Sequence, residues 1–114
     1  MTAPPSLDIA AVSAYCEQRV PPHALHQVRM QAVVNRHTVT LASVMRGDGR
    51  SLGPEWTRSP VARLRWSVSR REWTLSSGVT ATTAGTAYEY TAPTTEIARL
   101  LEEIDRDPTG IFWG

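Results

Sequence analysis

The stretch "QVRMQAVVNRHTVTLASV" (27–44) decides the fold, because apolar side chains recur at every second position in both of its halves. The recurring residues are Val28, Met30, Ala32 and Val34 in the first half, and Val39 and Leu41 in the second. A period of two is typical of a strand with one buried face. Because the polar turn Asn35-Arg36-His37 separates the halves, the stretch predicts a β-hairpin.

Three further strands are predicted by the same alternation. The run after Pro60 places one apolar set, Ala62, Leu64, Trp66 and Val68, opposite Arg63 and Arg65. "EWTLS" (72–76) turns Trp73 and Leu75 inward, and "TAYEY" (86–90) is expected to turn Tyr88 and Tyr90 inward. Between them, "SSGVTATTAGTA" (76–87) has no large side chain to bury, which predicts a mobile, protruding hairpin.

A helix is predicted before the strands. In "SLDIAAVSAYCEQRV" (6–20) apolar residues return every three or four positions, at Ile9, Val12, Cys16 and Val20. We expect Ser6 or Asp8 to cap its start and Pro21-Pro22 to end it. Cys16 then faces the core, where a buried structural thiol is favoured over a nucleophile.

A second helix follows the strands, with Ile97, Leu100, Leu101 and Ile104 on one face, Pro93 and Thr94 at its start and Pro108 after its end. The chain therefore predicts one α+β domain, residues 1–114: a five-stranded antiparallel sheet with the N-terminal and C-terminal helices packed on one face. We interpret Ile111, Phe112 and Trp113 as a structural clamp against the core. The alternative is an exposed tail that docks into a partner.

Composition excludes several classes of function. All twelve basic residues are arginine, so no Schiff-base or P-loop lysine is available, and the net charge is +1. A single cysteine allows no intrachain disulfide, which favours a reducing compartment. "MTAPPSLD" lacks the features of a signal peptide, and no run of about 18 apolar residues occurs. We therefore expect a cytoplasmic location and no membrane partner.

No pattern of catalytic or metal-binding residues is specific. His23, His26 and Cys16 supply too few ligands for a closed zinc site, and the serines lack a nucleophile-elbow motif. The sequence predicts no enzyme, no catalytic residue, no cofactor and no metal.

Two places are candidate binding surfaces. The connector "RGDGRSLGPEWTRSP" (46–60) contains Glu55, Trp56 and Arg58, interpreted as a packed loop with a surface ion pair or, alternatively, as a small cleft in which Arg58 binds an anion. The outer sheet face carries Arg29, Arg63 and Arg65 among Gln31, Thr38, Thr40 and Thr74. A plain solvated face is favoured there over binding to phosphates or an acidic protein, since Glu72 can neutralise an arginine and no aromatic residue interleaves.

Four segments resemble the bacterial, largely actinobacterial family of domains of unknown function DUF3024. They are "CEQRVPPHALHQVR" (16–29), "GPEWTRSPVARLRW" (53–66), "WTL" (73–75) and "EIDRDPTGIFWG" (103–114). The resemblance covers essentially the whole chain. It implies no activity, substrate or catalytic residue.

The leading hypothesis is a small non-catalytic binding or regulatory module that contacts a protein or another anionic partner through the loop Gly53–Pro60 and the arginine-bearing face. Nucleic-acid binding by that face is one alternative, and a small enzyme with a cleft near Glu55, Trp56 and Arg58 is another. Homodimerisation through an edge strand is also possible, because an open sheet has two edges.

Overall fold

The computed structural model describes residues 4–25, 27–46, 56–77 and 85–113. These described residues form two α-helices, α1 (Ser6–Arg19) and α2 (Ile97–Arg106), and a short 3-10 helix, η1 (Pro22–Ala24). The strands are β1 (Val28–Asn35), β2 (Thr38–Arg46), β3 (Trp56–Ser67), β4 (Glu72–Ser77) and β5 (Thr86–Ala87). The predicted mobile hairpin falls mostly on residues 78–84, outside the described residues.

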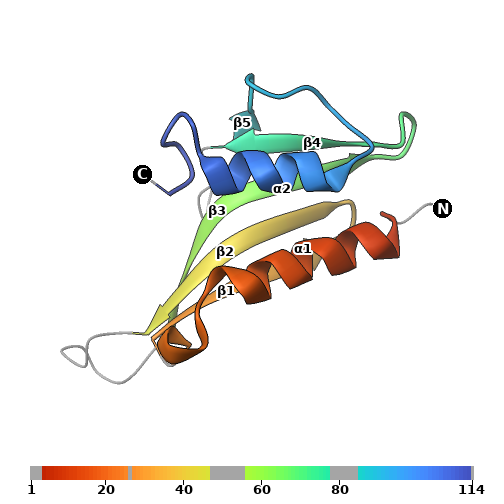
Figure 1. Ribbon diagram of the computed structural model, residues 1–114. Helices are drawn as coiled ribbons and strands as arrows, with labels where there is room; N and C mark the ends of the chain where they lie inside the picture. The colour runs from red at the N-terminus through yellow and green to blue at the C-terminus, as the bar shows by residue number, and fades with distance from the viewer. Residues whose placement is uncertain (1–3, 26, 47–55, 78–84, 114) are drawn as a thin grey trace.

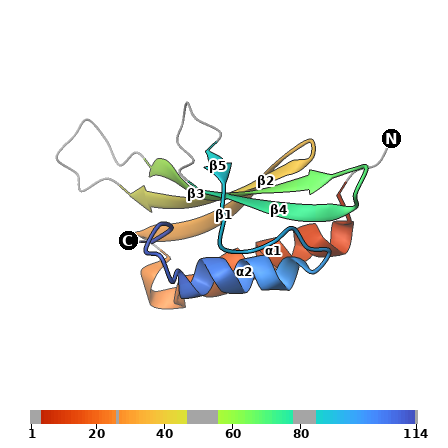
Figure 2. The same cartoon turned by 90° about the horizontal axis from the view of Figure 1, so that it is seen from above.

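The strands form one antiparallel sheet in the order β1-β2-β3-β4-β5, with each strand beside the next one in the chain (Figure 1). Both helices lie on the same face of this sheet, as Figure 2 shows from above. The predicted α+β class and its single layer of helices are therefore confirmed. Asn35 pairs with Thr38, so the first hairpin turns over two residues, Arg36 and His37, rather than the predicted three.

The core lies between the helices and the inner sheet face. Val39, Leu41, Ala62, Leu64 and Trp73 are fully buried there. The predicted helix faces are confirmed, because α1 buries Val12 and Cys16 while α2 buries Ile97, Leu100, Leu101 and Ile104. The helices also meet through Asp105 of α2, which accepts a hydrogen bond from Tyr15 at 3.1 Å and pairs with Arg19 at 3.5 Å.

Three predicted inward side chains are exposed instead. Val34 is 46% exposed because it belongs to the edge strand β1, and Val68 is 42% exposed because β3 ends before it. Tyr90 is 69% exposed, since β5 stops at Ala87 and the chain leaves the strand conformation there. Tyr88 is buried as predicted, against Phe112 at a ring-centroid distance of 5.2 Å.

The predicted connector to Pro60 is wrong at its end, because β3 already begins at Trp56 and pairs with β2 along its length. A register shift between Leu41 and Ala42 accommodates the extra residue Val61. The bulge resets the alternation, so residues before Pro60 follow a different phase from those after it. The sequence predicts Pro60 as the end of the connector, whereas it lies inside β3.

The segment after α2 folds back as the clamp interpretation expects, with one exception. Asp107 ends α2 in a left-handed conformation (φ 44°), and its carboxylate accepts the backbone N–H groups of Phe112 at 3.0 Å and Trp113 at 2.8 Å. Phe112 is buried, and the Trp113 indole donates to the Ile104 carbonyl at 2.8 Å. Ile111 is 51% exposed, so the prediction that it packs inward is wrong.

Candidate anion-binding face

The outer sheet face presents two cross-strand rows centred on β3. Arg65 lies between Thr38 of β2 and Thr74 of β4, and Arg63 lies between Thr40 and Ser76. In each row a guanidinium group is flanked by hydroxyl groups on both sides, because residues opposite one another on paired strands share a face. The sheet register therefore brings together the outward side chains predicted from alternation.

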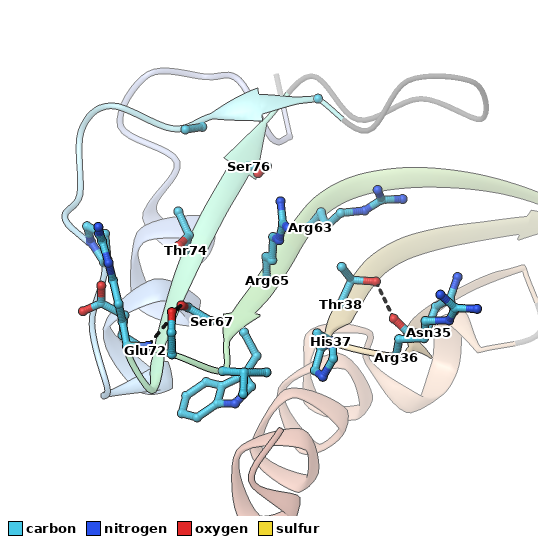
Figure 3. A pocket seen from close by; sticks show the side chains of 17 residues that line it. Asn35, Arg36, His37, Thr38, Arg63, Arg65, Ser67, Glu72, Thr74 and Ser76 are labelled. Carbon is cyan, nitrogen blue, oxygen red and sulfur yellow. Dashed lines mark hydrogen bonds between the residues drawn. The ribbon is translucent and has the colours of Figure 1, made fainter. Parts of the chain in front are cut away.

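Two hairpin turns enlarge this surface. Arg36 lies in the β1–β2 turn and Arg70 in the β3–β4 turn, and both turns adjoin the end of β3 that carries Arg65. With Arg63 and Arg65 they line one open depression of about 1200 Å³ (Figure 3). We call these four arginines and the depression they line the arginine face.

The charge on the arginine face is strongly one-sided. Its lining contains four arginines against one acidic residue, Glu72. Arg63 donates to the Thr40 hydroxyl at 3.3 Å, and within the described ranges no ion pair neutralises any of the four arginines. Glu72 pairs in register with Ser67, so the expected neutralisation across the strands is not observed among the described residues.

A planar guanidinium offers a fork of N–H donors that matches a carboxylate or phosphate. Hydroxyls from Ser67, Ser69, Thr74 and Ser76 line the same depression and can donate further hydrogen bonds to such an anion. The arrangement is therefore suited to holding an extended anion in this open depression. Arg63 is half-buried and Arg65 is exposed, so solvent reaches part of each residue.

The other predicted binding residues lie elsewhere. Arg58 donates to the Gln31 side-chain oxygen at 2.9 Å, and Arg29 donates to the Leu25 carbonyl at 3.2 Å. Both arginines flank Val44 in register, whereas Arg63 is opposite Thr40. Four residues of strand, roughly 13 Å, separate the two groups.

The predicted loop site is therefore not assembled with the arginine face. Trp56 is the first residue of β3, and Glu55 lies outside the described residues, so the proposed pairing of Glu55 with Arg58 stays a prediction. Arg58 is instead engaged with β1 through Gln31.

Sequence reasoning missed Arg36 and Arg70. Alternation assigns faces within strands but says nothing of side chains in turns. The clue was present in the polar clusters "NRH" (35–37) and "SRRE" (69–72), which stand at the two hairpin turns. Register determines that both turns reach the same end of the sheet as Arg65, and register cannot be read from one strand alone.

Other candidate chemistry finds no geometric support in the parts that the structure describes. No group of three or more His, Cys, Asp or Glu side chains is placed to hold a metal ion there. Burial raises the pKa of the Cys16 thiol to about 11, so it stays protonated at neutral pH and is a poor nucleophile. No described helix has the length and apolar character needed to cross a membrane.

Comparisons with known proteins identify the family of this chain but no individual relative. Neither the curated proteins nor the solved structures contain a match to this chain. The family model described as "Domain of unknown function (DUF3024)" matches residues 2–114. Because the match spans nearly the entire sequence, including all the described strands and helices, this chain belongs to the DUF3024 family.

Proposed function

We propose that this protein is a non-catalytic binding module that holds an acidic, extended segment of a partner protein on the arginine face. The observation that supports the proposal most directly is the alternation of Arg63 and Arg65 on β3, each flanked by hydroxyls and neither neutralised by an ion pair in the described ranges. Two residues of strand separate these side chains by roughly 6.6 Å. Carboxylates at alternate positions of an extended peptide repeat at the same spacing.

An acidic peptide fits this face better than a nucleic acid does. Strong nucleic-acid binders carry a high positive charge, whereas the net charge here is +1. Bases bound as single strands stack on aromatic rings, and the tryptophan that lines the depression, Trp66, is 8% exposed and packs against Trp73. Glu72 within the depression would also repel a uniformly charged phosphate chain but leaves room for a peptide with spaced carboxylates.

The test uses two fluorescein-labelled peptides of equal length, one alternating Glu with Ser and one alternating Gln with Ser, titrated with the protein by fluorescence anisotropy. We expect the Glu peptide to bind and the Gln peptide not to bind. The double variant Arg63→Ala/Arg65→Ala should weaken the Glu peptide at least tenfold. Arg106→Ala removes an exposed arginine from α2, across the sheet, and should leave affinity within twofold.

Two results would overturn the proposal. Equal loss in the double variant and in Arg106→Ala would show that overall charge, not this face, controls binding. A labelled single-stranded oligonucleotide that binds more tightly than the Glu peptide, with affinity falling steeply as salt rises, would favour the nucleic-acid alternative.

A further inference from the structure

The two edges of the sheet differ. On one side β4 is covered by β5 and by the bridge between Trp73 and Thr94, where the backbone N–H of each residue donates to the carbonyl of the other at 2.7 and 3.0 Å. On the other side β1 is the last strand in the sheet order, and within the described residues no strand pairs with its outer edge (Figure 1). One edge of eight residues is therefore open to another strand.

The backbone register shows which groups this edge offers. The Trp66 N–H donates to the His37 carbonyl at 2.7 Å, so the backbone polar groups of His37 point toward β3. Those of the next residue, Thr38, therefore point toward β1. Antiparallel ladders alternate, so Asn35, Val33, Gln31 and Arg29 bond to β2. The N–H and C=O groups of Val28, Met30, Ala32 and Val34 point away from β2, toward the open edge.

Three of these four residues leave apolar surface incompletely covered, whereas Met30 is buried. Val28 and Ala32 are half-buried and Val34 is 46% exposed, whereas Val39 and Leu41 beside them on β2 are fully buried. A groove of about 480 Å³ adjoins residues 30–34 of β1 and Ser13, Cys16 and Glu17 of α1. A strand laid along β1 would continue the inner apolar layer beneath α1.

The β1 edge also lacks several of the devices that usually prevent strand addition. It contains no proline, its pairing with β2 has no irregularity, and its one charged residue is Arg29. The opposite edge is short and covered by the chain itself. Since one edge is open and the other is covered, pairing between copies closes at two rather than extending into a fibre.

We propose that a second copy of this chain pairs antiparallel with β1, so that two molecules share one continuous sheet. A two-fold axis at Gln31 places Val28 opposite Val34 of the second copy and Met30 opposite its Ala32. In this register the N–H and C=O groups of all four outward-pointing residues form hydrogen bonds with the second copy. It sets Arg29 opposite an apolar valine, Val33 of the second copy, so no like charges meet.

The first test is the mass of the protein in solution, measured by light scattering after size exclusion across a concentration series. We expect twice the chain mass for the wild type and half that mass for Ala32→Pro. The Ala32 N–H points outward, so proline there removes a bond to the second copy but none to β2. Val34→Lys places a charge on the apolar side of the open edge and should also give a monomer. Circular dichroism checks that both variants remain folded.

The second test fixes the register. In a Cys16→Ser background, Gln31→Cys places two thiols at a non-hydrogen-bonded pair across the axis, where Cα atoms lie about 4.5 Å apart, within disulfide range. Mild oxidation should give a covalent dimer, and Arg65→Cys on the outer face should give none. A monomeric wild type up to millimolar concentration would overturn the proposal. A dimer that persists in both Ala32→Pro and Val34→Lys and does not crosslink through Gln31→Cys would also overturn the proposal.

Discussion

The Trp73 indole N–H, on β4, donates a 2.8 Å hydrogen bond to the carboxylate of Asp8 in the first turn of α1. Trp73 is fully buried, and a buried indole N–H needs an acceptor. This bond joins residues 65 positions apart and fixes the start of α1 against the inner face of the sheet. It also explains why Asp8 is not the helix cap predicted from sequence, since no side chain caps α1.

Asp8→Ala should destabilise the protein by about 1–3 kcal/mol, because it leaves the buried indole N–H without a partner. Asp8→Asn keeps an oxygen acceptor and should cost about half as much or less. Urea unfolding followed by circular dichroism measures both. Equal loss in the two variants would mean that the negative charge near the helix N-terminus, rather than the hydrogen bond, supplies the stability.

Asp107→Ala should release the C-terminal segment. The carboxylate holds the amides of Phe112 and Trp113, and the residue itself adopts the left-handed conformation that, after glycine, Asn and Asp tolerate best. We expect a loss of about 2 kcal/mol in the free energy of unfolding. Asp107→Asn preserves both an acceptor and the backbone preference and should cost less. Hydrogen exchange at the Phe112 and Trp113 amides should accelerate in the Ala variant, and unchanged exchange would contradict the clamp.

The strands and helices could be predicted because their periods are local. Trp73 and Leu75 face inward on alternation alone, and Ile97, Leu100 and Ile104 share a helix face for the same reason. The predictions that are wrong concern features that the local sequence does not determine. The sequence predicts Asp8 as a cap of its own helix because its actual partner, Trp73, is distant, and it predicts Tyr90 inward because nothing local marks the end of β5.

The candidate site was predicted in part for the same reason. Arg63 and Arg65 follow from alternation within β3, but Arg36 and Arg70 join them through the register of two hairpins. The hydrogen bond from Arg58 to Gln31 likewise joins residues of two strands, so the sequence alone does not indicate it.

Stability should fall at alkaline pH. Burial raises the pKa of Cys16 from an ordinary 9.0 to about 11, and burial with the Asp105 hydrogen bond raises that of Tyr15 from 10.0 to about 12. The folded state thus holds these protons more tightly than the unfolded state. Their contribution is complete below pH 9 and is lost as pH rises through the window from 9 to 12. The chain has no lysine to titrate in this window.

Urea unfolding at a series of pH values measures this loss. Cys16→Ala should lower the pH dependence between 9 and 11, and Tyr15→Phe should lower it between 10 and 12, whatever each substitution does to stability at pH 7. Slopes identical to that of the wild type in both variants would contradict the assignment.

Arg36→Gly should raise stability while weakening the binding proposed for the arginine face. Arg36 occupies the left-handed region at φ 56°, a conformation that costs a non-glycine residue about 1 kcal/mol and costs glycine little. The substitution should therefore stabilise the fold by up to about 1 kcal/mol. Because it also removes one of the four arginines, affinity for the Glu peptide should fall several-fold.

Arg71 has φ 53° and is not among the residues that line the depression, so Arg71→Gly should give the same stability gain without the loss of affinity. Natural chains retain strained residues where function requires the side chain, and this pair of variants separates the two effects by thermal unfolding and anisotropy. If both variants bind the peptide like the wild type, Arg36 is a turn residue alone and takes no part in the arginine face.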